Sequence, residues 1–273
     1  MATHAYALEN PLDHERLVIQ AKALDRIAER YMREAGFAPG MRVLDLGSGM
    51  GDSALLAARL TAPDGRVVAV ERSAETAAAA RARLESLGAT AVDYVQADVT
   101  DLPPLESQFD AVITRLLIMH VADPVAVLRD AAALVRPGGI ILSMEYDLAW
   151  LPCHPPSPTW DRAVEILVET MRRAGIHTRM GLELRSAFVA AGLGEPTMRS
   201  EQDVGGSADW TGYDNLALVL RSLLPVIEAT GSADPDELDV DTLADRFREE
   251  VADRGSMAAM PPLVGAWARV VSE

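Results

Sequence analysis

The chain of 273 residues has little that would place it outside the cytoplasm. Its single cysteine, Cys153, excludes a framework of intrachain disulfides, as is usual for cytoplasmic proteins. No apolar run is long enough to span a membrane, because the longest candidate, residues 216–227, is interrupted by Arg221 and Pro225. The first twenty residues contain no apolar segment typical of a signal peptide. We therefore expect a cytoplasmic protein with no membrane partner.

Basic residues are few relative to acidic ones, with 25 Lys and Arg against 41 Asp and Glu, and the formal net charge is -16. Such a charge repels a phosphate backbone, so we expect no nucleic-acid partner and a small-molecule substrate instead. The length suffices for one large domain, or for a core with a sizeable insertion.

The first half alternates between apolar strand patterns and helical patterns with short connections. A leading helix is predicted at 14–35, and the predicted strands are 41–47, 64–72, 90–98, 109–117 and 140–147. The last helix of this half is expected to end in a Pro-Gly-Gly turn at 137–139. The alternation predicts an α/β fold with a doubly wound, mostly parallel sheet, in which the carboxyl ends of the parallel strands share one edge.

The second half is richer in helix. Helical patterns cover 158–175, 182–194 and 209–255, and strand patterns cover 196–206 and 261–271. We read the last helical segment as an insertion between the last two strands of the sheet. The predicted domains are an N-terminal helical cap (1–36), a core (37–208), a helical insertion or lid (209–257) and a final strand (258–273).

A loop with three alternating glycines, VLDLGSGMGDS at 43–53, follows the first strand. A phosphate-binding P-loop would need lysine after Gly51, where Asp52 stands. A dinucleotide loop would need glycine at position 52, because a carboxylate there faces the pyrophosphate at a helix N-terminus. A plain turn does not require this spacing of glycines with an acid, Asp45, two places ahead.

Acidic residues at three successive strands indicate a cofactor without phosphates. Asp45 suits the ammonium of an aminoacyl tail, Glu71 can accept both hydroxyls of a ribose, and Asp98 can accept from an adenine amino group. The Val99 amide lies beside that adenine position. The ligand that combines these parts is S-adenosylmethionine.

These motifs resemble the class I S-adenosylmethionine-dependent methyltransferases over residues 40–147. VLDLGSGMGDS, VVAVERS, QADVTDLP and VRPGG occur in the family's order and spacing. The stretch is also similar to small-molecule methyltransferases of bacterial secondary metabolism, through ERLVIQ before the loop and TRLLIMHVADP after it. The resemblance implies a seven-stranded Rossmann-like sheet with an antiparallel last strand, and it fades beyond residue 200.

The resemblance also implies roles for single residues. The glycines that would surround the aminoacyl part are Gly47, Gly49 and Gly51. Glu71 would hold the ribose, Asp98 with Val99 the adenine, and the Arg115 carbonyl the amino group. Residues ahead of the loop would close over the tail carboxylate, namely Tyr6, Arg16 and Gln20, although a surface pair explains Arg16 and Gln20 nearly as well. We also assign Ser48, Arg72 and His120 to the cofactor site.

Three residues are candidates for a base that removes a proton from the acceptor. They are His120 after the fourth strand, Glu145 at the end of the fifth, and His177 ahead of a helix. In the resembling family a histidine like His120 also packs beside the cofactor without catalysing, and a helix-cap role explains His177 as well. His154 lies among prolines and is expected in a loop. The strands are not followed by a cluster of metal ligands, so we expect no metal.

Two further features each have two interpretations. The aromatic residues of the second half either line a substrate pocket or form core: Trp150, Trp160, Trp210 and Tyr213. The apolar helix at 216–227 either lines an apolar pocket or forms a homodimer contact.

Taken together, these patterns predict a methyltransferase that transfers a methyl group from S-adenosylmethionine to a small, apolar metabolite of bacterial secondary metabolism, such as antibiotic biosynthesis. The product of the cofactor would be S-adenosylhomocysteine. Two alternatives stay open. One is a cyclase or isomerase of the same fold that binds the cofactor without methyl transfer, and the other is a non-catalytic sensor of adenosyl ligands.

Overall fold

The computed structural model describes residues 12–105 and 108–271. The chain groups into two compact units. The unit that we call the core unit comprises Ala21–Glu145, Met180–Ser200 and the chain from Leu263. The unit that we call the insertion unit comprises Tyr146–Arg179 and Glu201–Pro262, with the first part of helix α1 up to Gln20.

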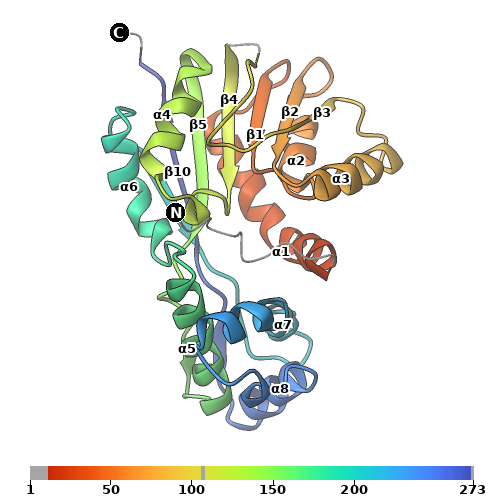
Figure 1. The fold of residues 1–273 in the computed structure, drawn as a ribbon, viewed down its shortest axis with the longest axis vertical. Coiled ribbons are helices and arrows are strands. Elements are labelled where there is room, and N and C mark those ends of the chain that lie inside the picture. Colours follow the sequence, from red (N-terminus) through yellow and green to blue (C-terminus); the bar gives the residue numbers. More distant parts are fainter. Residues whose placement is uncertain (1–11, 106–107, 272–273) are drawn as a thin grey trace. The chain divides into compact units, whose positions relative to one another are not determined.

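The core unit is built on a seven-stranded sheet with the spatial order β3-β2-β1-β4-β5-β10-β7 (Figure 1). Its strands are β1 (Arg42–Leu46), β2 (Arg66–Glu71), β3 (Val92–Gln96), β4 (Phe109–Arg115), β5 (Val135–Tyr146), β7 (Thr197–Glu201) and β10 (Leu263–Arg269). Strands β3, β2, β1, β4 and β5 pair in parallel. The end of β10 meets the start of β5, since Val270 N donates to Gly139 O and Gly138 N to Val270 O, so β10 is antiparallel to β5. The predicted fold class is therefore confirmed.

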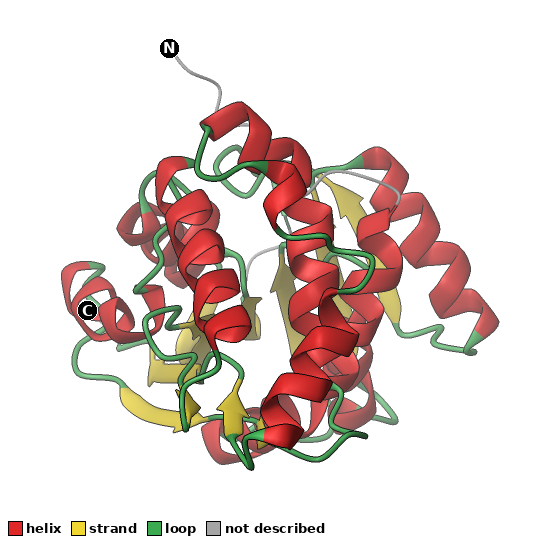
Figure 2. Cartoon of the chain, turned by 90° about the horizontal axis from the view of Figure 1, so that it is seen from below, coloured by secondary structure: helices red, strands yellow, loops and turns green. Residues whose placement is uncertain are grey.

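Helices cover both faces of this sheet (Figure 2). They are α1 (Leu12–Ala35), α2 (Asp52–Thr61), α3 (Ala74–Ser86), the 3-10 helix η1 (Ile118–His120), α4 (Pro124–Ala133) and α6 (Met180–Ala190). Helix α3 begins after Ser73, whose hydroxyl accepts from Thr76 N as expected for an N-cap. Strands covered on both faces bury nearly every side chain, and Val112 and Ile113 of β4 are fully buried.

Strand β5 begins earlier than the sequence predicts. The Pro-Gly-Gly segment lies inside the strand, and the register against β4 shifts between Phe109 and Ala111. Gly138 has a φ of +77°, a conformation that glycine adopts without strain. The turn signal therefore marks a bulge in a strand and not the end of a helix.

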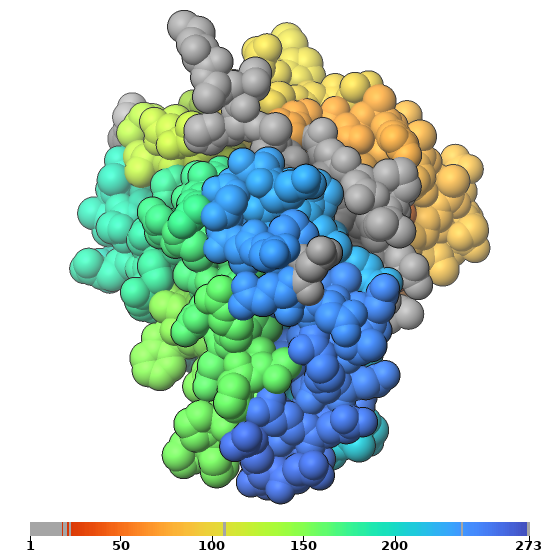
Figure 3. Space-filling view, turned by 60° about the horizontal axis from the view of Figure 1, so that its bottom comes forward, coloured from red at the N-terminus to blue at the C-terminus, as the bar shows by residue number. Residues whose placement is uncertain are grey.

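The insertion unit packs helices around aromatic side chains. Its elements are β6 (Cys153–His154), α5 (Pro158–Arg173), β8 (Val204–Gly205), α7 (Gly212–Thr230), the 3-10 helix η2 (Pro235–Glu237), α8 (Leu243–Asp253) and β9 (Met257–Ala259). Helices α5, α7 and α8 contact one another, which is visible in Figure 3 as adjoining green and blue segments. The three short strands form a second sheet, in the order β6-β9-β8. His154 thus lies in a strand, with an exposed side chain, and not in a loop.

The aromatic residues of this unit settle one open interpretation. Trp160 and Tyr213 are fully buried, Trp210 is nearly so, and all three are in ring contact with one another. These residues form core, whereas Trp150 is 60% exposed.

The apolar side of α7 is likewise buried within its own unit, at Leu216, Leu220, Leu223 and Ile227. Packing of this unit alone explains its hydrophobicity, so neither a pocket wall nor a dimer contact is required.

The compact units differ from the sequence-based boundaries. Residues 146–179 group with the insertion unit, although the sequence pattern assigns them to a core of 37–208. The strand predicted at 196–206 is divided between two sheets, as β7 and β8. Within the described residues, no helix is long and apolar enough to cross a membrane.

Candidate active site

The glycine loop between β1 and α2 requires glycine for both conformation and packing. The φ angles of Gly47, Gly49 and Gly51 are +68°, +52° and +85°, which side chains of L-residues rarely allow. A Cβ atom added at Gly47 would lie 2.5 Å from Leu117 Cδ1, and one added at Gly51 would lie 2.5 Å from the Tyr94 hydroxyl. The backbone of this loop is therefore closely packed and has a fixed shape.

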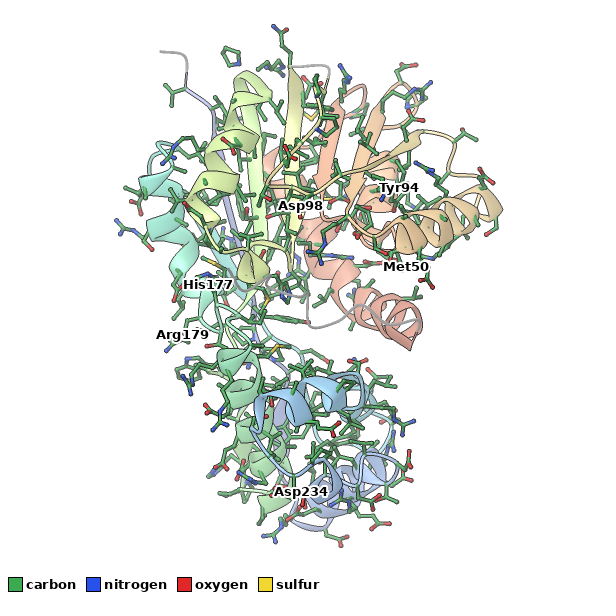
Figure 4. All side chains as sticks on the ribbon, viewed as in Figure 1. Met50, Tyr94, Asp98, His177, Arg179 and Asp234 are labelled. Carbon is green, nitrogen blue, oxygen red and sulfur yellow. The ribbon has the colours of Figure 1, made fainter. Side chains whose placement is uncertain are left out.

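Tyr94 on β3 holds the first half of the loop. Ser48 Oγ donates to the Tyr94 hydroxyl at 2.8 Å, and that hydroxyl donates to Gly49 O at 3.3 Å. Burial raises the pKa of Tyr94, so the hydroxyl keeps its proton. Figure 4 labels Tyr94 and Met50, which lie at this loop. The predicted residue Ser48 thus contacts the loop's support, while Tyr94 was missed.

Arg83 on α3 holds the second half. Its Nη1 donates to Met50 O at 2.7 Å, and its Nη2 to Asp52 Oδ1 at 2.6 Å. This contact weakens one argument from the sequence, because the carboxylate of Asp52 is neutralised and does not by itself exclude a phosphate. No local pattern marks Arg83, which is 31 positions from its partner.

Glu71 at the end of β2 is oriented by two backbone amides. Gly49 N donates to Oε2 at 3.0 Å, and Ser73 N donates to Oε1 at 2.9 Å. Each carboxylate oxygen has a second acceptor site, so Glu71 can still accept from the two hydroxyls of a ribose. The residue is half-buried and lies directly beside the glycine loop.

Asp98 follows β3 and is held in an ionised state. Thr100 donates to its Oδ1 through both the backbone amide, at 2.8 Å, and the hydroxyl, at 2.7 Å. Partial burial raises the pKa of Asp98, but these bonds and the charge of exposed Arg72 outweigh burial, and the pKa is lowered overall. Asp98 and Val99 are both half-buried, as expected of residues that contact a base.

Asp45 is a buried carboxylate with one oxygen that lacks a donor. It is 1% exposed, and none of the residues that the structure describes donates to its Oδ2. Burial raises the pKa of Asp45 to about 7, against the opposing charge of Arg115. Arg115 Nη1 is itself paired with Asp25 Oδ1 on α1 at 3.1 Å. The charge of Arg115 thus acts on both carboxylates, although only Asp25 is bonded to it.

Glu145 at the end of β5 holds the segment after β4. It is 0% exposed, and its Oε1 accepts from Leu117 N at 3.0 Å and Ile118 N at 2.9 Å. Burial raises the pKa of Glu145 to about 8, although these amides oppose the shift. His120 ends η1 with a half-buried side chain. Tyr146 and Asp147, which follow Glu145, are buried too.

The remaining predicted residues are placed less closely or not at all. Tyr6 lies outside the described residues, and so do the side chains of Arg16 and Gln20, although α1 includes both positions. His177 is half-buried in the turn before α6 and belongs to the insertion unit (Figure 4). The structure therefore places Glu71 in contact with the glycine loop, Asp45 on the strand before it and Asp98 after strand β3, while the roles of all these residues stay predictions.

Within the described residues, no group of three or more His, Cys, Asp or Glu side chains is placed to hold a metal ion. An open cleft of about 450 Å³ in the insertion unit is lined by Thr159, Arg246, Glu249, Glu250, Asp253 and Arg254. None of the residues assigned to the cofactor lines this cleft.

The sheet order and its flanking helices define a Rossmann-like protein, with the glycine loop and the acidic residues at the edge where such folds bind ligands. A family model described as a methyltransferase domain matches residues 37–178, just over half of the chain. The chain belongs to this methyltransferase family, and its cofactor is S-adenosylmethionine.

Curated proteins match the sequence of this chain over part of their own length. The ubiquinone biosynthesis O-methyltransferase of Bradyrhizobium sp. (strain ORS 278) is 33% identical over an alignment of 159 positions, which covers 52% of this chain and 60% of that protein. The chain spans about half the length of the curated relatives that it matches.

Solved structures share the fold. The YcgJ protein of Bacillus subtilis is 19% identical with a TM-score of 0.55, covering 89% of this chain and 99% of that one. The [4+2]-cyclase SpnF is 18% identical with a TM-score of 0.52, covering 92% and 83%. Likeness at this level shows the fold alone, which proteins of different activity share.

Proposed function

We propose that this chain transfers a methyl group from S-adenosylmethionine to a small, apolar acceptor by direct displacement and releases S-adenosylhomocysteine. One observation carries the proposal. Asp45 is a buried carboxylate with an unpartnered oxygen, at a loop of three glycines whose backbone admits close approach. A buried charge is stable only when paired, so the site calls for a cationic ligand such as the aminoacyl tail.

Residues of this chain would hold the ligand along the strand ends. Asp45 and the Arg115 carbonyl would face the ammonium, Glu71 the ribose, and Asp98 the adenine amino group. When bound, the cofactor supplies a methyl group on a positively charged sulfur, so that an acceptor's lone pair can bond to the methyl carbon while the carbon–sulfur bond breaks and the sulfur leaves neutral. Positioning and exclusion of water then supply much of the acceleration, about 7–11 kcal/mol in well-oriented reactions.

The acceptor's proton needs a base when the acceptor is a hydroxyl, an amine or an acidic carbon. His120 is our first candidate, because it follows β4 at the edge that carries the cofactor residues. His177 is the second, whereas Glu145, the third candidate from the sequence, is fully buried with one oxygen bound to two backbone amides.

An apolar acceptor is supported by relatives named for ubiquinone biosynthesis, among them a C-methyltransferase of Pasteurella multocida. We further propose a bacterial cytoplasmic enzyme of specialised metabolism, consistent with the single cysteine. A homodimer stays a proposal, to be decided by sedimentation.

Calorimetric titration with S-adenosylmethionine and S-adenosylhomocysteine tests the binding part. Micromolar binding with one site per chain is expected, and the absence of binding would contradict the proposal. Incubation with methyl-labelled cofactor and a panel of phenols and quinols then tests transfer. Release of S-adenosylhomocysteine with a labelled acceptor supports methyl transfer, whereas binding with an altered but unlabelled substrate supports the cyclase alternative.

A further inference from the structure

We propose that Glu145 is a positioning residue, which fixes the segment Leu116–His120 against the glycine loop, and that it is not the base that takes the acceptor's proton. The inference rests on the proposed function, because it assigns a role within the same site.

The first observation is the bonding of the carboxylate. Glu145 is 0% exposed, and Oε1 accepts from both Leu117 N and Ile118 N. These amides begin η1 and point to one oxygen atom. A base needs access to its substrate, whereas a carboxylate that binds consecutive amides fixes the direction of a backbone turn.

The second observation is that this turn is strained. Leu116 has a φ of +51°, which residues other than glycine seldom adopt. Such a conformation persists only where the surroundings enforce it. Leu116 N donates to Met144 O at 2.9 Å on one side, and the Glu145 bonds hold the next two amides on the other. Glu145 therefore supplies much of the constraint.

The third observation connects the turn to the cofactor loop. Leu117 packs so closely on Gly47 that its Cδ1 would lie 2.5 Å from an added Cβ. The same segment begins beside Arg115, whose carbonyl is proposed to accept from the ammonium, and ends at His120. A shift of Leu117 would thus move one wall of the loop, the carbonyl and the candidate base together.

The pKa of Glu145 agrees with a positioning role. Burial raises the pKa of Glu145 to about 8, so the carboxyl is largely protonated at neutral pH. Oε1 accepts from the amides whether the carboxyl is ionised or protonated, so the turn stays fixed in both states. A carboxamide in the same place would bind the amides equally well.

The test compares Glu145→Ala, Glu145→Gln and a matched control, Asp110→Ala. Asp110 also binds a backbone amide with its carboxylate, that of Arg42 at 2.7 Å, but at the opposite end of β1 and β4. Each variant and the native protein are titrated with S-adenosylhomocysteine, and amide hydrogen exchange is followed for residues 115–120.

We expect Glu145→Ala to speed exchange of the Leu117 and Ile118 amides at least about tenfold and to weaken S-adenosylhomocysteine binding by about tenfold, or about 1.4 kcal/mol. Glu145→Gln should restore slow exchange and bring the affinity to within about threefold of the native value. Asp110→Ala should leave amide exchange at 115–120 and the affinity as they are. If Glu145→Ala does not fold, Leu117→Ala takes its place, with the same loss of affinity expected.

Two results would overturn the inference. One is native exchange and native affinity in Glu145→Ala. The other is a Glu145→Gln variant with native exchange and affinity whose turnover, with an acceptor found as above, falls by about 100-fold or more, because that pattern identifies a base. Failure of the native protein to bind S-adenosylhomocysteine would contradict the proposed function alone, since the exchange experiment still decides whether Glu145 holds the turn.

Discussion

Arg83 on α3 and Asp52 at the start of α2 form an ion pair with 2.6 Å between Nη2 and Oδ1. The same guanidinium binds Met50 O, so one side chain holds both the backbone of the glycine loop and the first side chain of the helix that follows it. The two nitrogens of the planar guanidinium each make one of these bonds. The shape of the loop therefore depends on a residue outside it.

Replacement of Arg83 by lysine should weaken S-adenosylhomocysteine binding by about three- to tenfold, since an ammonium lacks the two fixed nitrogens that bind Met50 O and Asp52. Calorimetric titration measures the change. Arg185→Lys is the control, because Arg185 is an exposed partner of Glu195 in the same unit. Equal affinities in the two variants would show that the loop keeps its shape without the fork.

Gly47→Ala should cost about 1–3 kcal/mol of stability from the clash with Leu117, in addition to the cost of its positive φ, and should also lower the cofactor affinity. Gly88 offers a matched comparison. Its φ is +69°, against +68° at Gly47, and an added Cβ would meet no atom within 4 Å. Gly88→Ala should therefore show only the backbone cost of about 1 kcal/mol. Urea unfolding of both variants separates conformation from packing, and equal losses would contradict the close contact.

Binding of S-adenosylhomocysteine should weaken as the pH falls below about 7. Burial and the nearby carboxylates Asp52 and Glu71 raise the pKa of Asp45, whereas Arg115, shared with Asp25, lowers it, and the result is about 7. The ammonium of the ligand favours ionised Asp45, so the complex binds fewer protons than the free protein. The affinity is then full above the free pKa and falls by up to about tenfold per pH unit below it.

Titrations between pH 5.5 and 8 check this dependence. Asp45→Asn should bind more weakly at pH 8 and show a flat profile over the same range. A slope that persists in Asp45→Asn would assign the titration to another group.

Phe247→Ala should destabilise the protein by about 3–5 kcal/mol, because Phe247 is fully buried on α8 with its ring centroid 5.2 Å from that of Trp160. Trp150→Ala should change stability by no more than about 0.5 kcal/mol, since that ring is largely exposed. Chemical unfolding measures both. A large loss in Trp150→Ala would place that residue in a packed environment instead.

Most of the sheet could be predicted because its signals are local. Strands buried on both faces are continuous apolar runs, and glycines at 47, 49 and 51 show where the first strand ends. The acids at strand ends, Glu71 and Asp98, could be placed at one edge from topology alone. Signals that serve two purposes were misread, as at Gly138, where the same residues suit a turn or a bulge.

The residues that hold the glycine loop and Arg115 in place could not be predicted from the sequence. Tyr94, Arg83 and Asp25 lie 46, 31 and 90 positions from the partners that they bind. Nothing in their own neighbourhoods distinguishes them from other surface or strand residues. Glu145 was selected from the sequence for its place at the end of a strand, but its bonds to Leu117 and Ile118 are known only from the fold.

The sequence by itself determined the order of strands and helices, the glycine loop and the acids at the strand ends, because backbone conformation and burial leave periodic patterns in the chain. Only the tertiary structure decided which charges are compensated. Asp52 is neutralised by Arg83, while Asp45 keeps an oxygen without a donor among the described residues. Compensation depends on distances of a few ångströms between residues far apart in the chain, and that proximity exists only after folding.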